Sequence, residues 1–327
     1  MTSFDTAETP APTALMRVRA LNRTKLIFPA LILLLGIVTS LFEPRFFSLE
    51  NLLNLSRQLS PLLIISVGQT FAVIGGGLDL SVAAVLALCG VYGVLTMSHI
   101  GTAAGITMMI LCGGLFGIVN GLVISWFRAS PFIVTLGALS IARGLALTAT
   151  GGLPIYDLPD RYVNAIGFGS VLGIPWPPII AVVTLIAGHV LLKYTVFGRH
   201  VVAIGSSEPA ALYSGVNVGL TRTLIYGLSG ITAGIGAVVL TAWVSSAQPN
   251  AASGQELQSL AAVVLGGVAL TGGVGNLLDA FWGVLILGTL SNSLDMIGIS
   301  SFVQTLVTGA VIVLAAIVDG VRHKREY

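Results

Sequence analysis

Charged residues are scarce in this chain. Only 9% of its 327 residues are Asp, Glu, Lys or Arg, and 55% are hydrophobic. An ordinary soluble domain carries about 25% charged residues. A soluble chain of this length has no way to hide so much apolar surface from water, so lipid must be the solvent for most of it. The formal net charge of +2 is too small to indicate nucleic acid as a partner.

Cysteine and the motifs of catalysis are also nearly absent. Cys89 and Cys112 both fall inside apolar runs, which argues against a disulfide framework on exposed loops. The four histidines have no metal-ligand spacing, and the chain contains no HExxH or GxSxG motif. The glycine-broken stretch 266–276 lacks the Gly-Lys-[Ser/Thr] ending of a phosphate-binding loop. We therefore expect no catalytic residue, metal site or cofactor in this chain, and interpret 266–276 as a broken membrane helix or a tight cytoplasmic turn.

Long apolar runs fill most of the remaining sequence. A membrane span needs about 20 predominantly apolar residues, and on that rule the sequence predicts an all-α membrane protein with about ten transmembrane helices. The expected spans are 26–42, 60–76, 80–97, 103–127, 131–150, 177–194, 223–243, 257–274, 277–297 and 301–318. Residues 1–25 then form an N-terminal tail, residues 26–320 the transmembrane domain, and residues 321–327 a basic C-terminal tail.

The basic residues give these spans an orientation, because cytoplasmic loops are enriched in Lys and Arg. Basic residues precede the first span, follow the last, and recur in the polar loop 195–222, which carries Arg199. This pattern predicts that both termini and the loop 195–222 are cytoplasmic. Arg45 and Arg57, assigned to the first external loop, count against it. The largest external segment, 151–178, is interpreted either as an interfacial loop or as a docking surface for an external partner, and its size and polarity slightly favour docking.

A few polar residues lie within or beside the apolar spans. Asp79, in the sequence GGGLDLS, is set deep among apolar residues. It has two interpretations, as the cap of a half-helix that begins at Leu80 or as a residue lining the path of a transported solute. Capping beside the path satisfies both. For the asparagines, hydrogen bonding between helices is the default. The candidate path residues are Asp79, Ser81, Asn120, Asn276 and Asn292.

Glycines recur at spacings of four in two of the expected spans. Gly113, Gly117 and Gly121 lie in the fourth span, and Gly230 and Gly234 lie in the seventh. Such a stripe lets two helix backbones approach closely. We expect the contact to lie within one subunit, while contact between subunits stays open.

The polar loop 195–222 carries a short predicted helix. Ser206 or Ser207 caps it, Pro209 lies in its first turn, and Gly215 ends it. We expect its exposed face to consist of small residues, which suits insertion into a groove on a soluble protein. A helix lying at the membrane surface is the alternative. The segment comprises Ser207, Glu208, Pro209, Ala210, Ala211, Leu212, Tyr213, Ser214 and Gly215.

Four stretches together resemble one protein family. They are FGRHVVAIGSSEPAALYSGVNV and, in the family's order, residues 68–81, 131–152 and 261–290. The first resembles the cytoplasmic coupling segment of permease subunits of bacterial ABC importers for ribose, xylose, arabinose and related sugars. The resemblance covers nearly the whole chain beyond the N-terminal tail and is specific for the family, not for the sugar. Ala83, Pro209 and Tyr213 depart from the family's usual residues.

The resemblance implies a type II ABC importer-like permease of the bacterial inner membrane that translocates a monosaccharide or related polyol. It implies cytoplasmic ATPase subunits that bind ATP and Mg²⁺ and receive the coupling helix, a second permease chain, identical or related, and a periplasmic sugar-binding protein. Two alternatives stay open. One is an ABC permease for branched-chain amino acids or nucleosides. The other is an ion-coupled secondary carrier, for which Asp79 alone is thin support.

Overall fold

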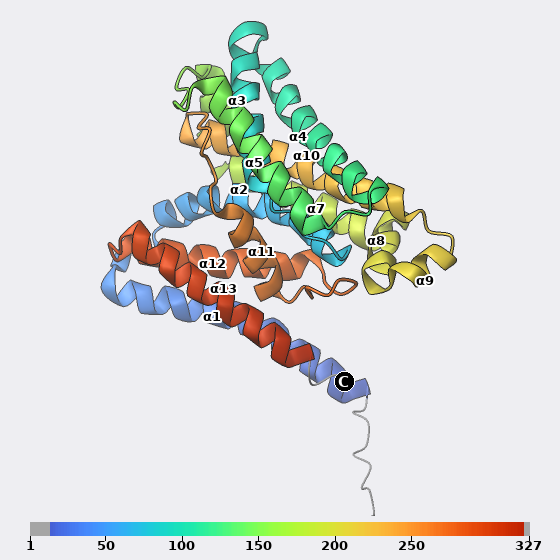
Figure 1. The fold of residues 1–327 in the computed structure, drawn as a ribbon. Helices are drawn as coiled ribbons and strands as arrows, with labels where there is room; N and C mark the ends of the chain where they lie inside the picture. The colour runs from blue at the N-terminus through green and yellow to red at the C-terminus, as the bar shows by residue number, and fades with distance from the viewer. Residues whose placement is uncertain (1–13, 324–327) are drawn as a thin grey trace, which may run out of the picture.

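The computed structural model describes residues 14–323, and the parts of the two predicted tails in residues 1–13 and 324–327 lie outside them (Figure 1). Within the described residues, seven helices are long and apolar enough to cross a membrane. These are α2 (Leu49–Ile74), α3 (Val82–Ile100), α4 (Thr102–Trp126), α5 (Pro131–Thr150), α7 (Trp176–Tyr194), α10 (Val218–Val244) and α12 (Leu277–Met296).

Two terminal helices add shorter apolar stretches. They are Ile27–Phe42 within α1 (Ala14–Phe42) and Ser301–Val311 within α13 (Ser301–His323). The chain is therefore a multi-pass all-α membrane protein, whereas the number of crossings, about ten, stays a prediction. Large apolar side chains such as Leu115 on α4, Ile133 on α5 and Val183 on α7 are exposed, which fits helices whose outer faces contact lipid.

Helix α2 begins well before the span predicted at 60–76. Ser48 caps it, because the Ser48 Oγ accepts a hydrogen bond from the Asn51 N–H at 3.2 Å. The assignment of Arg57 to an external loop is therefore wrong. Arg57 lies within α2, and its Nη1 donates to the Asn54 Oδ1 at 2.9 Å. The hydropathy rule missed the first turns of α2 because polar residues occupy them, although the helix is continuous from its cap at Ser48.

The span predicted at 257–274 is also wrong, because the helix there is short. Helix α11 (Gln255–Gly266) is about 18 Å long at 1.5 Å per residue, less than the roughly 30 Å of a bilayer's hydrocarbon core. It ends where Gly267 adopts a φ of +115°, a conformation that glycine enters most easily. Residues 267–276 between α11 and α12 are irregular, and the choice between a broken membrane helix and a tight cytoplasmic turn stays a prediction.

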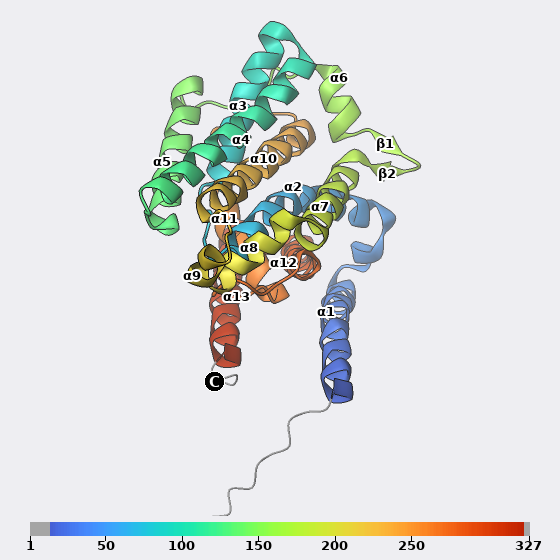
Figure 2. The ribbon, with the colours of Figure 1, turned by 90° about the vertical axis from the view of Figure 1, so that its right-hand side faces the viewer.

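Helices α4 and α10 lie side by side and approach as closely as backbones can (Figure 2). A Cβ atom added to Gly117 would fall on the Tyr226 carbonyl oxygen, and one added to Gly113 would fall on the Gly230 carbonyl oxygen. Gly234 similarly faces the backbone of α4 at Met109. The predicted glycine stripe therefore packs two helices of one subunit together.

The predicted external segment 151–178 is largely folded. It contains α6 (Asp160–Tyr162), the π-helical turn η2 (Val163–Gly167) and a hairpin of β1 (Ser170–Val171) and β2 (Ile174–Pro175). The Tyr162 hydroxyl is buried and lies 2.6 Å from the Val238 carbonyl oxygen of α10. This hydrogen bond fixes the segment on the end of α10.

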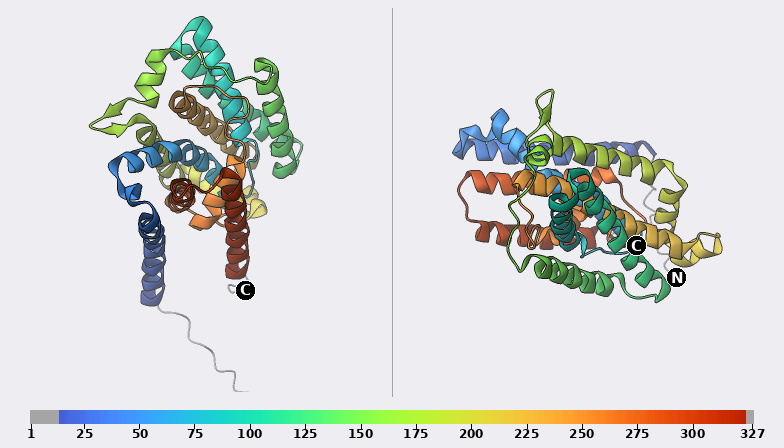
Figure 3. Two further views of the ribbon diagram at one scale, coloured as in Figure 1. Left: turned by 90° about the vertical axis from the view of Figure 1, so that its left-hand side faces the viewer. Right: turned by 90° about the horizontal axis from the view of Figure 1, so that it is seen from above.

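Three further short helices complete the chain. They are η1 (Pro44–Phe47), α8 (Val196–Ser206) and α9 (Glu208–Tyr213). The described ends of α1 and α13 lie at the same end of the molecule as α9 (Figures 1 and 3). The connections between α1 and α2 and between α12 and α13 lie at the opposite end (Figure 1).

Candidate functional site

Helix α9 forms as the capping signals predict. Ser207, rather than Ser206, is its N-cap, and the Ser207 Oγ accepts a hydrogen bond from the Ala210 N–H at 3.4 Å. At the other end Gly215 has a φ of +83°, and the Val216 N–H donates to the Ala211 carbonyl at 3.1 Å. This left-handed glycine turn is a common helix terminator, and it fixes the length of α9 at six residues.

The faces of α9 differ from the expectation of a small-residue exposed face. Ala211 is only 4% exposed and packs with Ile204 and Val218. Because this one small residue anchors the helix, its larger neighbours point outward, and Tyr213 is 89% exposed. We call the exposed residues of α9 other than Glu208 the α9 surface. It consists of Pro209, Ala210, Leu212 and Tyr213.

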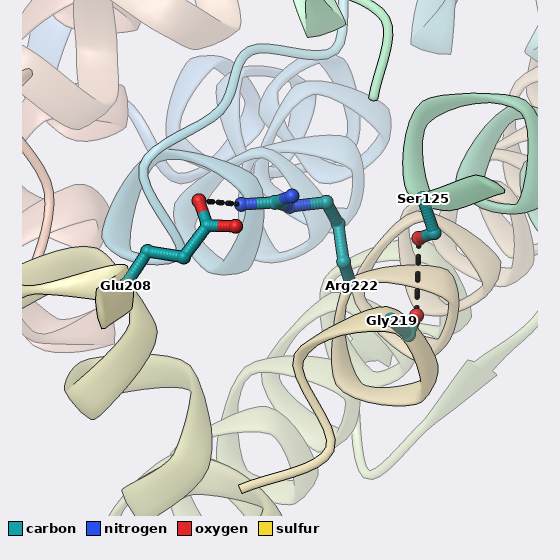
Figure 4. Close-up of polar contacts among 4 residues, drawn as sticks. All are labelled: Ser125, Glu208, Gly219 and Arg222. Carbon is teal, nitrogen blue, oxygen red and sulfur yellow. Dashed lines mark hydrogen bonds and ion pairs between the residues drawn. The ribbon is translucent and has the colours of Figure 1, made fainter. Parts of the chain in front are cut away.

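An ion pair holds α9 to the start of α10 (Figure 4). The Arg222 Nη2 lies 2.7 Å from the Glu208 Oε2, and the two side chains are 20% and 53% exposed. The Ser125 Oγ at the end of α4 donates to the Gly219 carbonyl at 3.0 Å. Both side chains of the ion pair border a groove of about 950 Å³ that also contains Tyr213. The α9 surface therefore stands beside a groove and is connected through α10 to α4.

A second cluster of polar groups surrounds Asp79 in the break between α2 and α3. The Asp79 Oδ1 accepts hydrogen bonds from the Ser81 N–H at 3.0 Å and the Ser81 hydroxyl at 2.6 Å. Its Oδ2 accepts from the Ser229 hydroxyl of α10 at 2.6 Å. The Asn120 amide of α4 donates to the Ser81 Oγ at 3.0 Å. Three of the five candidate path residues therefore meet in one hydrogen-bonded network.

Asp79 lies just before α3 and is not its N-cap, since α3 begins at Val82 and its N-cap residue is Ser81. Both Asp79 carboxylate oxygens are hydrogen-bonded within the chain, and the residue is only 2% exposed. The carboxylate therefore joins the α2–α3 break to α10. A role for Asp79, Ser81 or Asn120 in a solute path stays a prediction.

The other two candidates lie elsewhere and bond to other helices. The Asn276 Oδ1 caps α12 and lies 3.1 Å from the His189 Nδ1. Asn292 of α12 exchanges two hydrogen bonds with Asn51 of α2, each at 3.1 Å. These contacts are the helix-to-helix bonds that were the default for asparagine.

Sequence reasoning missed two residues that organise these regions. Arg143 of α5 donates through Nη1 to the carbonyls of Pro249 and Ala251, at 2.7 and 3.1 Å, and thereby ties α5 to the loop before α11. A cation inside the apolar run 131–150 was the available signal. Ser229 gave no signal, because one serine in an apolar helix is unremarkable until its partner is known.

Comparison with known proteins identifies the family. A family model described as the permease component of a branched-chain amino acid transport system matches residues 51–316. The ribose import permease of Bacillus subtilis is 41% identical over 289 residues, which are 88% of this chain and 89% of that protein. The L-arabinose transport system permease of Escherichia coli K12 is 36% identical, over 89% of each chain.

A third relative extends the same result. The L-arabinose ABC transporter permease of Azospirillum brasilense is 33% identical over 94% of this chain and 90% of its own. No solved structure matches. The chain therefore belongs to the ABC transporter permease family that includes these ribose and arabinose permeases, which are membrane transport subunits and not enzymes.

Proposed function

We propose that this chain is the membrane-spanning permease of an ABC importer for a monosaccharide, with a pentose as the first candidate. The matched relatives are named for ribose and L-arabinose. The observation that carries the coupling role is the α9 surface, a capped helix with exposed apolar side chains beside a groove. Such a surface suits insertion into a soluble ATPase subunit, which would supply the bound ATP and Mg²⁺.

The orientation belongs to the same proposal. The ends of α4 and α7 lie toward the α9 end of the molecule (Figure 1), and Arg128, Lys193 and Arg199 follow or adjoin these helix ends in sequence. By the positive-inside rule this end is cytoplasmic, in the inner membrane of a bacterium. The loop 195–222 and both tails, 1–25 and 321–327, then face the cytoplasm. The folded segment 151–178 faces outward, where a periplasmic sugar-binding protein would dock.

Transport would follow from movement of packed helices. Two ATPase subunits that close on ATP would displace the α9 helices of two permease chains, identical or related. Because packed helices shift as rigid bodies between discrete arrangements, that displacement would switch the path from outward to inward access.

The experiment tests Ala210, an exposed residue of the α9 surface. Ala210→Glu places a carboxylate in the apolar contact, where an unpaired polar group costs about 1–3 kcal/mol, or roughly fivefold to 150-fold in the binding constant. We expect ATP-driven uptake of labelled ribose or arabinose into proteoliposomes to fall at least about fivefold. Ala211 is unsuitable for this test, because it is buried and a charge there would disturb folding.

Two controls make the result specific. Ser170→Glu adds the same charge on the exposed hairpin at the other end of the chain and should leave association with the ATPase unchanged. Normal uptake by a well-expressed Ala210→Glu variant would contradict the coupling role. Uptake that stops when ion gradients are collapsed, with ATP retained, would instead indicate a secondary carrier, and uptake of leucine or a nucleoside alone would overturn the sugar assignment.

A further inference from the structure

A polar cavity lies among α2, α11, α12 and α13, apart from the Asp79 network. Its volume is about 180 Å³. Among the described residues no Asp, Glu, Lys or Arg lines it, although the Asp295 carboxylate accepts a hydrogen bond from the lining residue Gln304. We call it the glutamine cavity. Its polar lining consists of Gln58, Gln255, Gln258, Ser291, Gln304 and Thr308.

The glutamine cavity lies toward the end of the molecule opposite α9. Gln255 is the first residue of α11, and Gln304 is the fourth residue of α13. The connection between α12 and α13, close to Ser291 and Gln304 in sequence, is at that opposite end (Figure 1). In the proposed orientation, the cavity is therefore in the outer half of the membrane, where a solute enters.

The lining amides differ in whether they are already bonded. The Gln304 Nε2 of α13 donates to the Asp295 Oδ1 of α12 at 2.6 Å and to the Ile299 carbonyl at 2.9 Å. Among the described residues, the side chains of Gln58 and Gln258 have no hydrogen-bond partner, and the Gln255 Oε1 is buried without one. Nearby, Asn51 and Asn292 show the alternative, since their amides satisfy each other. Gln58 and Gln258 are half-buried, so the cost of a buried unpaired group, about 1–3 kcal/mol, applies to the Gln255 Oε1. These groups are therefore expected to bind a molecule that enters the cavity.

The chemistry of the lining selects the kind of molecule. Each glutamine amide offers both donors and an acceptor, which match the hydroxyl groups of a neutral polyol. Because no charged side chain in the described part of the chain lines the cavity, it offers no ion pair to a charged ligand. Leu59, Leu62 and Leu287 add apolar surface for the C–H faces of a sugar ring. At about 30 Å³ per water molecule, the volume of about 180 Å³ corresponds to about six waters, which suits one monosaccharide.

We propose that the glutamine cavity is a binding site for a neutral monosaccharide on its way into the transport path. The identity of the solute rests on the proposed function, whereas the site itself rests on the cavity and its unpaired amides. The alternative is that the glutamine cavity holds only water and binds no sugar.

The first experiment measures occupancy directly. Gln258→Cys in the full-length chain, assembled with its ATPase in nanodiscs, is treated with a membrane-impermeant thiol reagent in the presence of ribose, arabinose or myo-inositol. We expect modification that slows at least about fivefold at saturating sugar. Ser170→Cys on the exposed hairpin is the matched control, and sugar should not change its rate. Modification of the Gln258→Cys thiol at the same rate with and without every sugar would mean that the cavity holds water only, and it would overturn the proposal. The absence of any modification would mean that the cavity cannot be reached from solution, and it would overturn the proposal too.

The second experiment measures transport. Gln255→Leu and Gln258→Leu keep the side-chain size but remove hydrogen bonds worth about 1 kcal/mol each. Each should raise the KM for uptake about fivefold, and ATP hydrolysis stimulated by the binding protein should persist. Thr107→Val on the exposed face of α4 is the control.

The two proposals fail in different ways. If both leucine variants take up a pentose with the same kinetics as the wild type, the role of the glutamine cavity is overturned and the proposed function is not. A wild-type importer that takes up no sugar would overturn the proposed function, and protection of the Gln258→Cys thiol by a polyol would then still decide the cavity.

Discussion

The ion pair between Glu208 and Arg222 allows a quantitative test of how α9 is held. The structure places Glu208 Oε2 and Arg222 Nη2 2.7 Å apart, with Arg222 mostly covered and Glu208 half exposed. The perturbation is a double-mutant cycle of Glu208→Gln and Arg222→Gln, with the reversed pair Glu208→Arg and Arg222→Glu beside it. Each single change removes only the charge interaction, because Ser207 and Gly215 still cap and end α9.

The exposure of Glu208 sets the magnitude. Two unit charges about 4 Å apart attract by about 4 kcal/mol at an effective dielectric constant near 20. Solvent around an exposed carboxylate and the entropy of two long side chains reduce measured values to about 0.2–1 kcal/mol. Since Arg222 is mostly covered, we expect the upper part of this range. A coupling of about 0.5–1 kcal/mol corresponds to roughly twofold to fivefold in the population of correctly positioned α9.

The assay is ATP-driven uptake into proteoliposomes at low and high salt. We expect each neutralised variant to lose about twofold to fivefold in uptake. The double variant should lose no more than either single variant. High salt should weaken the wild-type advantage, because screening acts on exposed pairs. The reversed pair should recover uptake relative to either single reversal. Additive losses, or a reversed pair no better than a single reversal, would refute the idea that this contact positions α9.

Three other changes test the fold around these sites. Gly117→Ala should lower stability in a thermal unfolding assay by about 1–3 kcal/mol through overpacking against α10, whereas Gly137→Ala, which faces open space, should be neutral or slightly stabilising. Asp79→Asn replaces a carboxylate that accepts hydrogen bonds from two hydroxyls, and loss of about 1.5–3 kcal/mol should lower the melting temperature. An unchanged melting temperature would contradict a stabilising role for this carboxylate. Tyr162→Phe removes the buried hydrogen bonds of the Tyr162 hydroxyl to the Val238 carbonyl and the Thr241 Oγ1, each worth about 0.5–1.5 kcal/mol. Burial raises the pKa of Tyr162, so the hydroxyl stays protonated in both the folded and the unfolded chain below about pH 10. The difference in unfolding free energy between wild type and Tyr162→Phe should therefore be constant below that pH, which thermal unfolding at several pH values measures.

Local signals in the sequence were sufficient for α9 and the glycine stripe. A serine cap, a proline in the first turn and a terminating glycine fix a short helix through contacts within a few residues, and the structure has Ser207 and Gly215 in those places. Spacing alone also located the stripe, because glycines four apart share a helix face. The start of α2 was missed because its polar residues carry no hydropathy signal, although Ser48 was present as a cap.

Long-range pairing lay beyond the sequence. The partner of Asp79 is Ser229, 150 residues later, and nothing in the apolar run around Ser229 marks it. The exposed face of α9 was wrong for the same reason. Which side of a six-residue helix is covered depends on Ile204 and Val218, and these come from the helices before and after it. The glutamine cavity likewise combines four helices whose order in space no local pattern states.

Helix α10 connects the two polar sites. Arg222 and Ser229 are seven residues apart on it, about 10 Å along the axis at 1.5 Å per residue, and they contact α9 and Asp79 respectively. Tyr226, between them, lies with its hydroxyl 3.3 Å from the Leu78 carbonyl in the same break. Because α10 is packed backbone-to-backbone on α4, we expect it to move as a rigid body, so that a displacement of α9 would also move the groups that contact Asp79. Loss of the Glu208–Arg222 contact and loss of the Asp79 carboxylate therefore act on one chain of contacts, so their effects on uptake should combine non-additively.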